Sequence, residues 1–585
     1  MDDGGKGIVY SRKLIAIFIF IFTFLLFTPS LKNDFIWDDV IEIQKQYFKY
    51  QKYSLSSLII PPVRETKSTS YYRPVFHLSY VLDYSIWTDH PYGFHLTNII
   101  LYALSCVLLY FLILLILKEC HTESKEYIAL MSVVYFSVHP MHVESVSWVA
   151  GRTDILCGLF FIAAFISHIK SHDKSAYILL SIPLFCLSLL SKEVAVSFPF
   201  VVLFHDILKD KKINKKTIAG FAVYLVILVV YLFIRNRALY NIPPISPGPH
   251  ELSEGAGFLA QYLNQVKAIL GAYLYYFVKI IFPFSFNSFI TDIPKSAVLI
   301  NLSTIVFISL FYIIYRSLKD WNRLYGISIV WVVLTLGPSV LVAIFTIAST
   351  RLAERYLFLP VAGFSIIVGY IAVKLCRRSG RYTISYAVIL IFMFAHIFLT
   401  INRQYVWRDR LSFWKDASSG VDDNAIPLIN YGMALIDMGK PDLGIEKLEM
   451  SLNSEMQANN SLKCIAANNL GIAYLGKGKL GEAEKWFKKG VSYNPEFRKS
   501  YFHLGLIHYF RGRGGKSIEE LNIAEYYFRE ALEKDSSYAR AYFLLAKIYV
   551  EYGKTETARD YAGKALEIGL EKPLDDQARK IINKR

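Results

Sequence analysis

Two adjacent carboxylates, Asp38 and Asp39, follow the point at which an apolar stretch over residues 14–30 ends. A carboxylate at a membrane surface is desolvated enough to have a shifted pKa and is still reachable from water, which suits a general base or a cation site. An ordinary acidic interfacial loop would have the same composition. The other polar residues of the chain therefore decide between these interpretations.

A second polar group lies between two later apolar stretches. The run His139-Pro140-Met141-His142-Val143-Glu144 is followed by Gly151-Arg152-Thr153-Asp154. The two imidazoles and the nearby carboxylate could ligate a divalent cation, although Pro140 disfavours the regular helix that would align them. We favour the alternative, a hydrogen-bonding cluster that orients a polar ligand. Its predicted members are His139, His142, Glu144 and Asp154.

Cations recur beside the remaining apolar stretches. They are Arg73, Arg152, Lys192, Arg351 and Arg355, and Glu193 and Glu354 stand next to two of them. Any one of these cations alone would be explained as a side chain that extends from the membrane interface into water. Together they predict a site for an anionic lipid headgroup with a leaving phosphate. We include Glu193 and Glu354 in the predicted binding set.

The elements that carry these residues are predicted to be membrane helices. Of the 585 residues, 54% are hydrophobic, and long apolar stretches repeat along the chain. The predicted spans are residues 14–30, 94–117, 127–138, 155–169, 176–190, 194–208, 218–234, 298–315, 327–347, 357–373 and 384–401. These eleven crossings define an all-α, polytopic membrane domain over residues 1–403.

The basic loops give the predicted orientation. Residues 209–216, 316–323 and 374–381 carry clusters of Lys and Arg, which favour the cytoplasmic side. Residues 262–286 are apolar enough to span, but a crossing there would put the first two loops on opposite sides. We therefore predict an interfacial or re-entrant segment. The N-terminus is then cytoplasmic, and the polar clusters and the C-terminus lie outside.

Charge and cysteine content exclude two other classes of site. Much of the formal charge of +16 lies in short loops between apolar stretches, so it is explained by membrane orientation, and no nucleic acid partner is predicted. The six cysteines are scattered without paired spacing, which supports neither a disulfide framework nor a zinc site built from cysteines.

The C-terminal part is predicted to be a repeat array over residues 424–585, after a linker over residues 404–423. Its clearest unit carries Leu470-Gly471, Tyr474, Ala483, Phe487 and Pro495, the offsets of a tetratricopeptide repeat. About four such units can be aligned, and the third has an insertion around residues 511–521 that predicts a longer loop between its helices. Such arrays mostly bind peptides or proteins, and a structural or dimerising solenoid is the alternative.

Seven motifs, taken in order, resemble the family of transmembrane and tetratricopeptide-repeat-containing O-mannosyltransferases and their bacterial relatives. They are Phe35-Ile36-Trp37-Asp38-Asp39, Tyr72-Arg73-Pro74, Gly93-Phe94-His95-Leu96-Thr97-Asn98, His139-Pro140-Met141-His142-Val143-Glu144, Gly151-Arg152-Thr153-Asp154, Leu190-Ser191-Lys192-Glu193 and Glu354-Arg355-Tyr356-Leu357-Phe358-Leu359-Pro360. The resemblance covers nearly the whole chain and is weakest over residues 236–297.

The resemblance implies a GT-C class, inverting glycosyltransferase. Such an enzyme takes a sugar, here expected to be mannose, from a polyprenyl-phosphate carrier and transfers it to a protein hydroxyl on the outer side of the membrane. An acidic residue of the first outer loop is the base, so we expect Asp38 in this role and Asp39 in support. No cofactor is implied with certainty, and a divalent cation stays open.

Alternatives remain for the acceptor and for the class of protein. The same scaffold could transfer to a glycan or lipid or transfer an oligosaccharide, and a non-catalytic membrane scaffold or a transporter would also have many spans. The expected location is the plasma (inner) membrane, multi-pass, with the repeats extracytoplasmic. In a eukaryote, the endoplasmic reticulum membrane would take its place.

Overall fold

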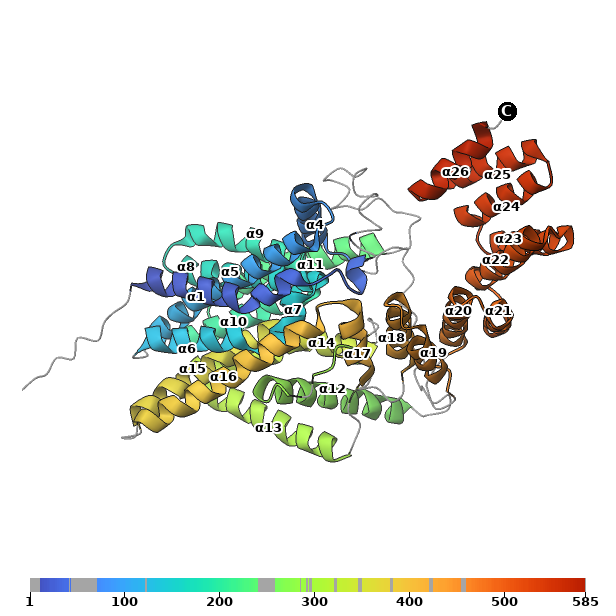
Figure 1. Ribbon diagram of the computed structural model, residues 1–585. Helices are drawn as coiled ribbons and strands as arrows, with labels where there is room; N and C mark the ends of the chain where they lie inside the picture. Colours follow the sequence, from blue (N-terminus) through green and yellow to red (C-terminus); the bar gives the residue numbers. More distant parts are fainter. Residues whose placement is uncertain are drawn as a thin grey trace, which may run out of the picture. The chain divides into compact units, whose positions relative to one another are not determined.

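The structure, a computed structural model, divides into two compact units, Met1–Asp416 and Ala417–Arg585 (Figure 1). It describes residues 11–40, 43, 71–120, 124–239, 258–284, 286–290, 293, 297–319, 323–345, 350–378, 382–419, 424–453 and 459–583. Across these ranges the regular structure is helical, and the β pairing is limited to an isolated bridge between Ile290 and Leu352. The all-α prediction is confirmed. We call the two parts the membrane unit and the repeat unit.

The membrane unit is built from long helices joined by short helical turns. Its α-helices are α1 (Arg12–Phe27), α4 (Pro74–Trp87), α5 (Pro91–Glu119), α6 (Lys125–Val138), α7 (Val143–Ser147), α8 (Arg152–Ser171), α9 (Ile178–Leu189), α10 (Phe198–Asp210), α11 (Lys215–Leu239), α12 (Phe258–Ile281), α13 (Ala297–Lys319), α14 (Arg323–Phe345), α15 (Phe358–Arg378) and α16 (Tyr382–Val406). The 3-10 turns are η1 (Thr28–Lys32), η3 (Pro140–His142), η4 (Val149–Gly151), η5 (Ser175–Tyr177), η6 (Glu193–Ser197) and η7 (Glu354–Leu357). Helix α17 (Arg410–Ser419) crosses the boundary between the units.

Eight helices of the described part are long and apolar enough to cross a membrane. They coincide with eight of the eleven predicted spans, so the chain is a multi-pass membrane protein. The other three predicted spans form α6, α9 and α10, which have 14, 12 and 13 residues. A perpendicular crossing needs about 20 residues. Length and composition alone therefore support eight crossings.

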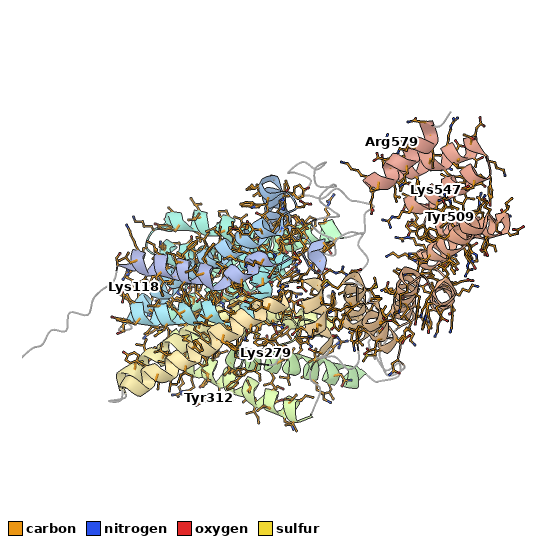
Figure 2. The ribbon with its side chains drawn as sticks, viewed as in Figure 1. Lys118, Lys279, Tyr312, Tyr509, Lys547 and Arg579 are labelled. Carbon is orange, nitrogen blue, oxygen red and sulfur yellow. The ribbon has the colours of Figure 1, made fainter. Side chains whose placement is uncertain are left out.

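The segment predicted to be interfacial or re-entrant is one continuous helix, α12, with 24 residues. Helix α12 itself contains no turn back toward the same side, and residues 282–284 of the predicted segment follow its end. The end of the helix is held by Lys279, whose Nζ donates to the carbonyl oxygen of Phe284 at 2.6 Å. Figure 2 shows Lys279 on α12 and the side chains that fill the space between the helices.

Close helix packing in the membrane unit brings distant polar residues together. Helix α5 packs against α1, α6 and α8, and α15 packs against α6, α8 and α14. Gly158 allows the approach of α8 to α15, because a Cβ there would lie 2.3 Å from the ring of Phe358. The N-terminal turn of α8 and the turn η7 before α15 are therefore neighbours, and these carry Asp154 and Arg355.

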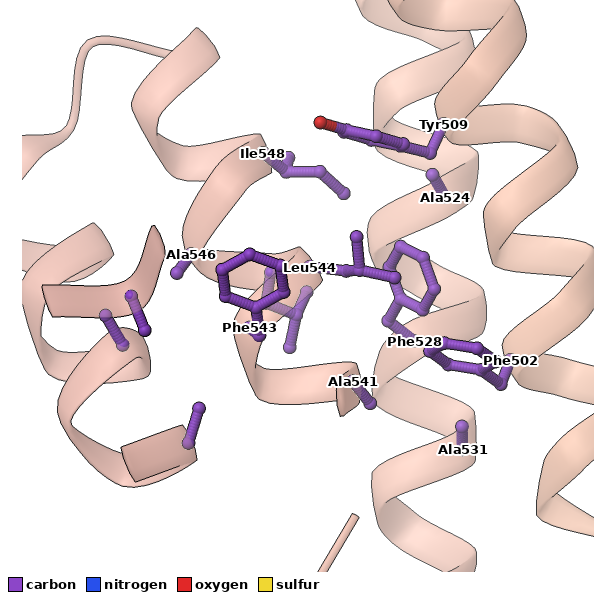
Figure 3. Packing of buried hydrophobic residues seen from close by; sticks show 14 of the residues in the cluster. Phe502, Tyr509, Ala524, Phe528, Ala531, Ala541, Phe543, Leu544, Ala546 and Ile548 are labelled. Atoms are coloured by element: carbon purple, nitrogen blue, oxygen red, sulfur yellow. The ribbon is translucent and has the colours of Figure 1, made fainter. Parts of the chain in front are cut away.

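The repeat unit consists of successive helix pairs, as predicted. The pairs are α18 (Ala425–Asp437) with α19 (Pro441–Met450), α20 (Asn460–Gly476) with α21 (Leu480–Tyr493), α22 (Arg498–Gly515) with α23 (Ile518–Lys534) and α24 (Ala539–Glu551) with α25 (Thr555–Ile568), followed by α26 (Lys572–Asn583). Figure 3 shows how Phe502, Phe528 and Leu544 pack between neighbouring pairs. Each pair buries its apolar face against the next one, which is how such arrays gain stability.

The predicted longer loop in the third repeat is wrong. Helix α22 continues to Gly515 and α23 begins at Ile518, so only Lys516 and Ser517 connect them. Lys516 ends α22 with a left-handed backbone at φ 50°, and Ser517 caps α23 by accepting the N–H of Glu520 at 3.3 Å. The inserted residues lengthen the helical part instead, because α23 has 17 residues where α21 has 14.

We predict that Gly471→Ala destabilises the second repeat. A Cβ at Gly471 would lie 2.4 Å from the ring of Phe487, and such overpacking costs about 1–3 kcal/mol. Hydrogen–deuterium exchange of the full-length protein should therefore be faster for peptides from α20 and α21.

Gly563→Ala in α25 is the matched control, because nothing lies within 4 Å of a Cβ at that position. Alanine is favoured over glycine by roughly 0.5–1 kcal/mol in a helix, so exchange in α25 should slow. Equal exchange rates in the wild type and Gly471→Ala would contradict the packing described here.

Candidate active site

The two carboxylates singled out in the sequence have different surroundings. Asp39 is fully buried, and its oxygens accept the N–H of Ala150 at 2.9 Å and of Ile36 at 3.3 Å. Asp38 is half-buried, and within the described ranges its carboxylate has no hydrogen-bond or ion-pair partner. Asp39 therefore fixes the loop, whereas the carboxylate of Asp38 is available to a ligand.

Burial also changes the proton affinity of both groups. Desolvation raises the pKa of Asp38, and the nearby Arg355 guanidinium opposes that rise. Desolvation raises the pKa of Asp39 well above its ordinary value, although its backbone hydrogen bonds act in the opposite direction. A carboxylate with a raised pKa is a stronger base when it is ionised, which suits Asp38 to accept a proton.

Trp37 holds this loop in place through an aromatic cluster. Its backbone has φ 51°, a left-handed conformation that a bulky residue rarely adopts and that costs about 1–3 kcal/mol. Its ring stacks on Trp148 with centroids 5.1 Å apart and also lies near Phe289, Phe413 and Trp414. These contacts stabilise the strained backbone immediately before Asp38.

This aromatic cluster was not predicted from the sequence. Trp37 stood within a quoted motif but was given no role, and Phe413 and Trp414 were assigned to the linker over residues 404–423. In the structure the membrane unit extends to Asp416, and Phe413 is fully buried. The signal in the sequence was the spacing of Trp407, Phe413 and Trp414 immediately after the last apolar stretch.

Arg355 connects the loop of Asp38 to the polar run after α6. Its backbone N–H donates to Oε2 of Glu144 at 2.9 Å, and its guanidinium pairs with Oε1 of the same carboxylate. The guanidinium also lies over the rings of Trp148 at 5.2 Å and Tyr356 at 5.0 Å. Arg355 is thus held on three sides in a fixed position near Asp38.

Two further ion pairs lie around Tyr356 and the start of η6. Lys192 Nζ donates to both carboxylate oxygens of Asp154, at 2.5 and 2.6 Å, and lies 4.9 Å from the centre of the Tyr356 ring. Arg73 pairs with Glu193 at 2.8 Å. Arg73, Lys192 and Arg355 each pair with a carboxylate. A phosphate bound to any of them would therefore share the cation with that carboxylate.

The exposure of the cations indicates which of them a ligand can reach. The side chains of Arg73 and Arg355 are 17% and 11% exposed, whereas that of Lys192 is 4% exposed. Arg351 is half-buried and has no hydrogen bond or ion pair with any part of the chain that the structure describes. Arg73, Arg351 and Arg355 are therefore the accessible cations of the predicted set.

Arg152, predicted to contact a ligand, is surrounded by partners within the membrane unit. Its side chain is fully buried and pairs with Asp83 at 2.5 Å. Its remaining N–H groups donate to Asn98 at 2.6 Å, to the carbonyl of Phe94 at 2.8 Å and to Ser79 at 3.2 Å. No donor is left for a phosphate, so Arg152 ties α4, α5 and α8 together.

The two histidines of the predicted metal or sugar cluster are buried in the membrane unit. His139 is buried, its Nε2 donates to the carbonyl of Ile280 at 3.1 Å, and its Nδ1 accepts the N–H of Met141 at 3.4 Å. His142 is buried between Phe136 and Phe358, with ring centres 4.3 and 5.1 Å away. Burial lowers the pKa of His139 to about 3 and that of His142 well below its ordinary value, so both are neutral.

Glu354 is also buried and paired within the membrane unit. It is 1% exposed, one oxygen accepts the N–H of Asn287 at 3.2 Å, and the other pairs with Arg403 at 3.3 Å. Arg403 also pairs with Asp416 at 2.9 Å. This network joins η7, the end of α16 and α17.

Comparison with known proteins is consistent with both units. The family model of the tetratricopeptide repeat matches residues 466–497 and 539–568, which correspond to α20–α21 and α24–α25. Human protein O-mannosyl-transferase TMTC4 is 25% identical over 72% of this chain and 63% of that protein. Protein O-mannosyl-transferase Tmtc3 of Drosophila melanogaster is 23% identical over 84% of this chain and 60% of that protein.

The chain is a relative of the TMTC protein O-mannosyl-transferases. The predicted resemblance is confirmed, as are the repeats. This TMTC relative spans about three fifths of the length of the two relatives named above. Among solved structures, the crystal structure of MamA matches with a TM-score of 0.23 and 20% identity, over 29% of this chain and 89% of that protein.

We predict that Arg152→Met destabilises the membrane unit of this TMTC relative by about 3–5 kcal/mol, because it leaves the buried carboxylate of Asp83 without its cation. The unfolding temperature in detergent, measured by fluorescence-detected size exclusion after heating, should fall accordingly.

Arg408→Met serves as the control, because the Arg408 side chain is 62% exposed and its pair with Asp409 lies at the surface. The double variant Arg152→Met/Asp83→Leu should recover part of the loss, since both charges are then removed. An unchanged unfolding temperature for Arg152→Met would show that this pair does not support the fold.

Proposed function

We propose that this chain is a membrane glycosyltransferase of the GT-C class that O-mannosylates proteins. The donor is mannose on a polyprenyl-phosphate carrier, the acceptor is a Ser or Thr hydroxyl, and the reaction takes place at the extracytoplasmic face. The observation that carries the proposal is Asp38, a partly desolvated carboxylate without a partner in the described part of the chain, held beside Arg355. The names of the relatives support the sugar and the protein acceptor.

The reaction requires a base for the acceptor hydroxyl. A hydroxyl group is a weak nucleophile, so its attack on the anomeric carbon is assisted when Asp38 removes the proton as the new C–O bond forms. The bond between the anomeric carbon and the phosphate oxygen breaks at the same time, and the phosphate leaves with the electron pair. Attack from the face opposite the phosphate inverts the anomeric configuration.

The leaving phosphate requires positive charge. Arg355 and Arg73 are partly exposed guanidinium groups that can form bidentate contacts with phosphate, and Arg351 supplies a third cation without a described partner. Glu144 and Glu193 keep two of these guanidinium groups in place before the donor binds. Such fixed charges stabilise the transition state without reorganisation.

The repeat unit supports a protein acceptor over a glycan or lipid acceptor. Arrays of this type mostly bind peptide or protein segments, and the relatives are named as protein O-mannosyl-transferases. A peptide held by the repeats of the same chain would have a raised effective concentration near the membrane. The repeats therefore contribute acceptor binding, and the membrane unit contributes the chemistry.

Asp38→Asn should lower the transfer rate at least about 10²-fold, the usual contribution of a general base. Purified protein is incubated with polyprenyl-phosphate-mannose and candidate acceptor peptides, with and without a chelator, and the glycopeptide is quantified by mass spectrometry. Asp34→Asn is the matched control, because Asp34 lies four residues earlier in the same loop and is exposed. Transfer at the wild-type rate by Asp38→Asn would refute the assigned base.

The transfer rate should fall on the acidic side with an apparent pKa above that of an ordinary aspartate. The base acts only when it is deprotonated, and burial raises the pKa of Asp38, so protonation inactivates it at a higher pH than usual. Arg355→Gln removes the charge that opposes this rise and should move the acidic limb to a still higher pH.

The profile of kcat/KM against pH measures this shift, because it reports the pKa values of the essential groups in the free enzyme. Arg351→Gln is the control. The causes of the shift in the pKa of Asp38 are burial and the charge of Arg355, and Arg351 is not among them. An acidic limb that stays in place in Arg355→Gln would argue against an Asp38 base next to Arg355.

A further inference from the structure

A second polar cluster lies at the far end of α8 from the candidate active site. His168 and His172 lie one turn apart near the C-terminal end of α8, and His205 and Asp206 lie near the end of α10. One ligand atom from each of the four residues lies within 4.8 Å of the others. Asp154 and His168 are fourteen residues apart on α8, or about 21 Å along the helix axis.

Three imidazoles converge on one carboxylate in this cluster. Oδ1 of Asp206 lies 3.2 Å from Nε2 of His168, 3.0 Å from Nε2 of His172 and 3.1 Å from Nδ1 of His205. In a tetrahedral site with metal–ligand distances near 2.0–2.1 Å, neighbouring ligand atoms are about 3.3 Å apart. The carboxylate oxygen therefore lies at nearly tetrahedral ligand spacing from each of the three nitrogens, and all four ligand atoms lie within 4.8 Å of one another.

Hydrogen bonds alone explain this arrangement poorly. A carboxylate only accepts, so each of the three imidazole nitrogens would have to carry a proton toward Asp206, where Nε2 of His168 lies 3.2 Å from both oxygens. The other nitrogen of His205, Nε2, lies 3.0 Å from Oε2 of Glu119, which is also an acceptor. A metal ion between these side chains would accept a lone pair from His205 and from Asp206 alike.

The outer contacts of the imidazoles are those of metal ligands. The ring nitrogen of His168 that faces away from Asp206, Nδ1, contacts the hydroxyl of Tyr224 at 3.1 Å, and that hydroxyl contacts Ser181 at 2.7 Å. The outer nitrogen of His205 contacts Glu119, which pairs with Lys209 at 2.8 Å. Ligating histidines are typically oriented by a carboxylate or hydroxyl at their second nitrogen.

Three of the four side chains of the cluster are buried, and the fourth, His172, is partly exposed. The side chains of His168, His205 and Asp206 are at most 5% exposed, whereas that of His172 is 29% exposed. An ion can therefore enter past His172 and then be held by three ligands of the interior. Three imidazoles and one carboxylate are a ligand set for Zn²⁺ or a similar divalent transition metal, and not for Ca²⁺ or Mg²⁺.

We propose that His168, His172, His205 and Asp206 bind one divalent transition-metal ion, for which Zn²⁺ is the best match. The ion joins α8 to α10 at the end of α8 remote from Asp154. Through Tyr224, which contacts His168, the site also involves α11. Its role is to stabilise this end of the membrane unit, separately from the chemistry at Asp38.

Metal content and affinity test the site directly. The full-length protein in detergent is stripped with a chelator, dialysed and loaded with Zn²⁺, and bound zinc is measured by mass spectrometry with a competing chromophoric chelator. The wild type should bind one zinc per chain at this site. His172→Ala and Asp206→Asn should lose it, and Tyr224→Phe should weaken it about 10-fold.

His90→Ala is the matched control, because His90 is exposed and outside the cluster, and its zinc binding should equal that of the wild type. Zinc should also raise the unfolding temperature of the stripped wild type but not that of His172→Ala. Equal zinc binding by the wild type and His172→Ala would overturn the proposal.

A cobalt titration of the wild type tests the site without any substitution. The test therefore remains valid if a variant does not fold. Co²⁺ added to the stripped wild type should give the intense visible absorption of a tetrahedral ion, and added Zn²⁺ should abolish it. A weak spectrum of a six-coordinate ion, or no bound cobalt, would overturn the proposal independently of any substitution.

Discussion

The buried pair between Arg355 and Glu144 is the interaction on which the polar centre of the membrane unit depends. Glu144 is 2% exposed, and its two oxygens bind the backbone and the guanidinium of Arg355. Removing one partner of such a pair usually costs about 3–5 kcal/mol, because the other charge stays buried. The pair links α7 to η7, and it brings the guanidinium next to Asp38 and between the rings of Trp148 and Tyr356.

The pairing of charges also explains how so many ionised groups are tolerated beside apolar helices. Lys192 with Asp154 and Arg73 with Glu193 repeat the same arrangement of one cation and one carboxylate. Each pair has no net charge, and buried charges that are paired in this way are tolerated beside apolar helices. Asp38 departs from this pattern, and a departure at one position is where function is expected.

Sequence patterns predicted the helical class and the repeats, because apolar length and repeat offsets are local properties. They did not distinguish a buried arginine from one that a ligand can reach. Arg152 and Arg355 both follow an apolar stretch in the sequence, but only the folded chain shows that Asp83, Asn98, Phe94 and Ser79 together occupy the donors of Arg152. The cluster of His168, His172, His205 and Asp206 was not predicted, because the C-terminal end of α8 and the end of α10 meet only through helix packing.

The two buried, neutral histidines His139 and His142 make the folded state less stable in acid. His139 has a pKa of about 3 in place of 6.5, so the unfolded chain binds a proton between these values and the folded chain does not. His142 shifts in the same direction. Each therefore removes about 1.4 kcal/mol of stability per pH unit as the pH falls below about 6.5. A compartment near neutral pH keeps both imidazoles uncharged and the interior of the membrane unit intact, whereas an acidified one favours its unfolding.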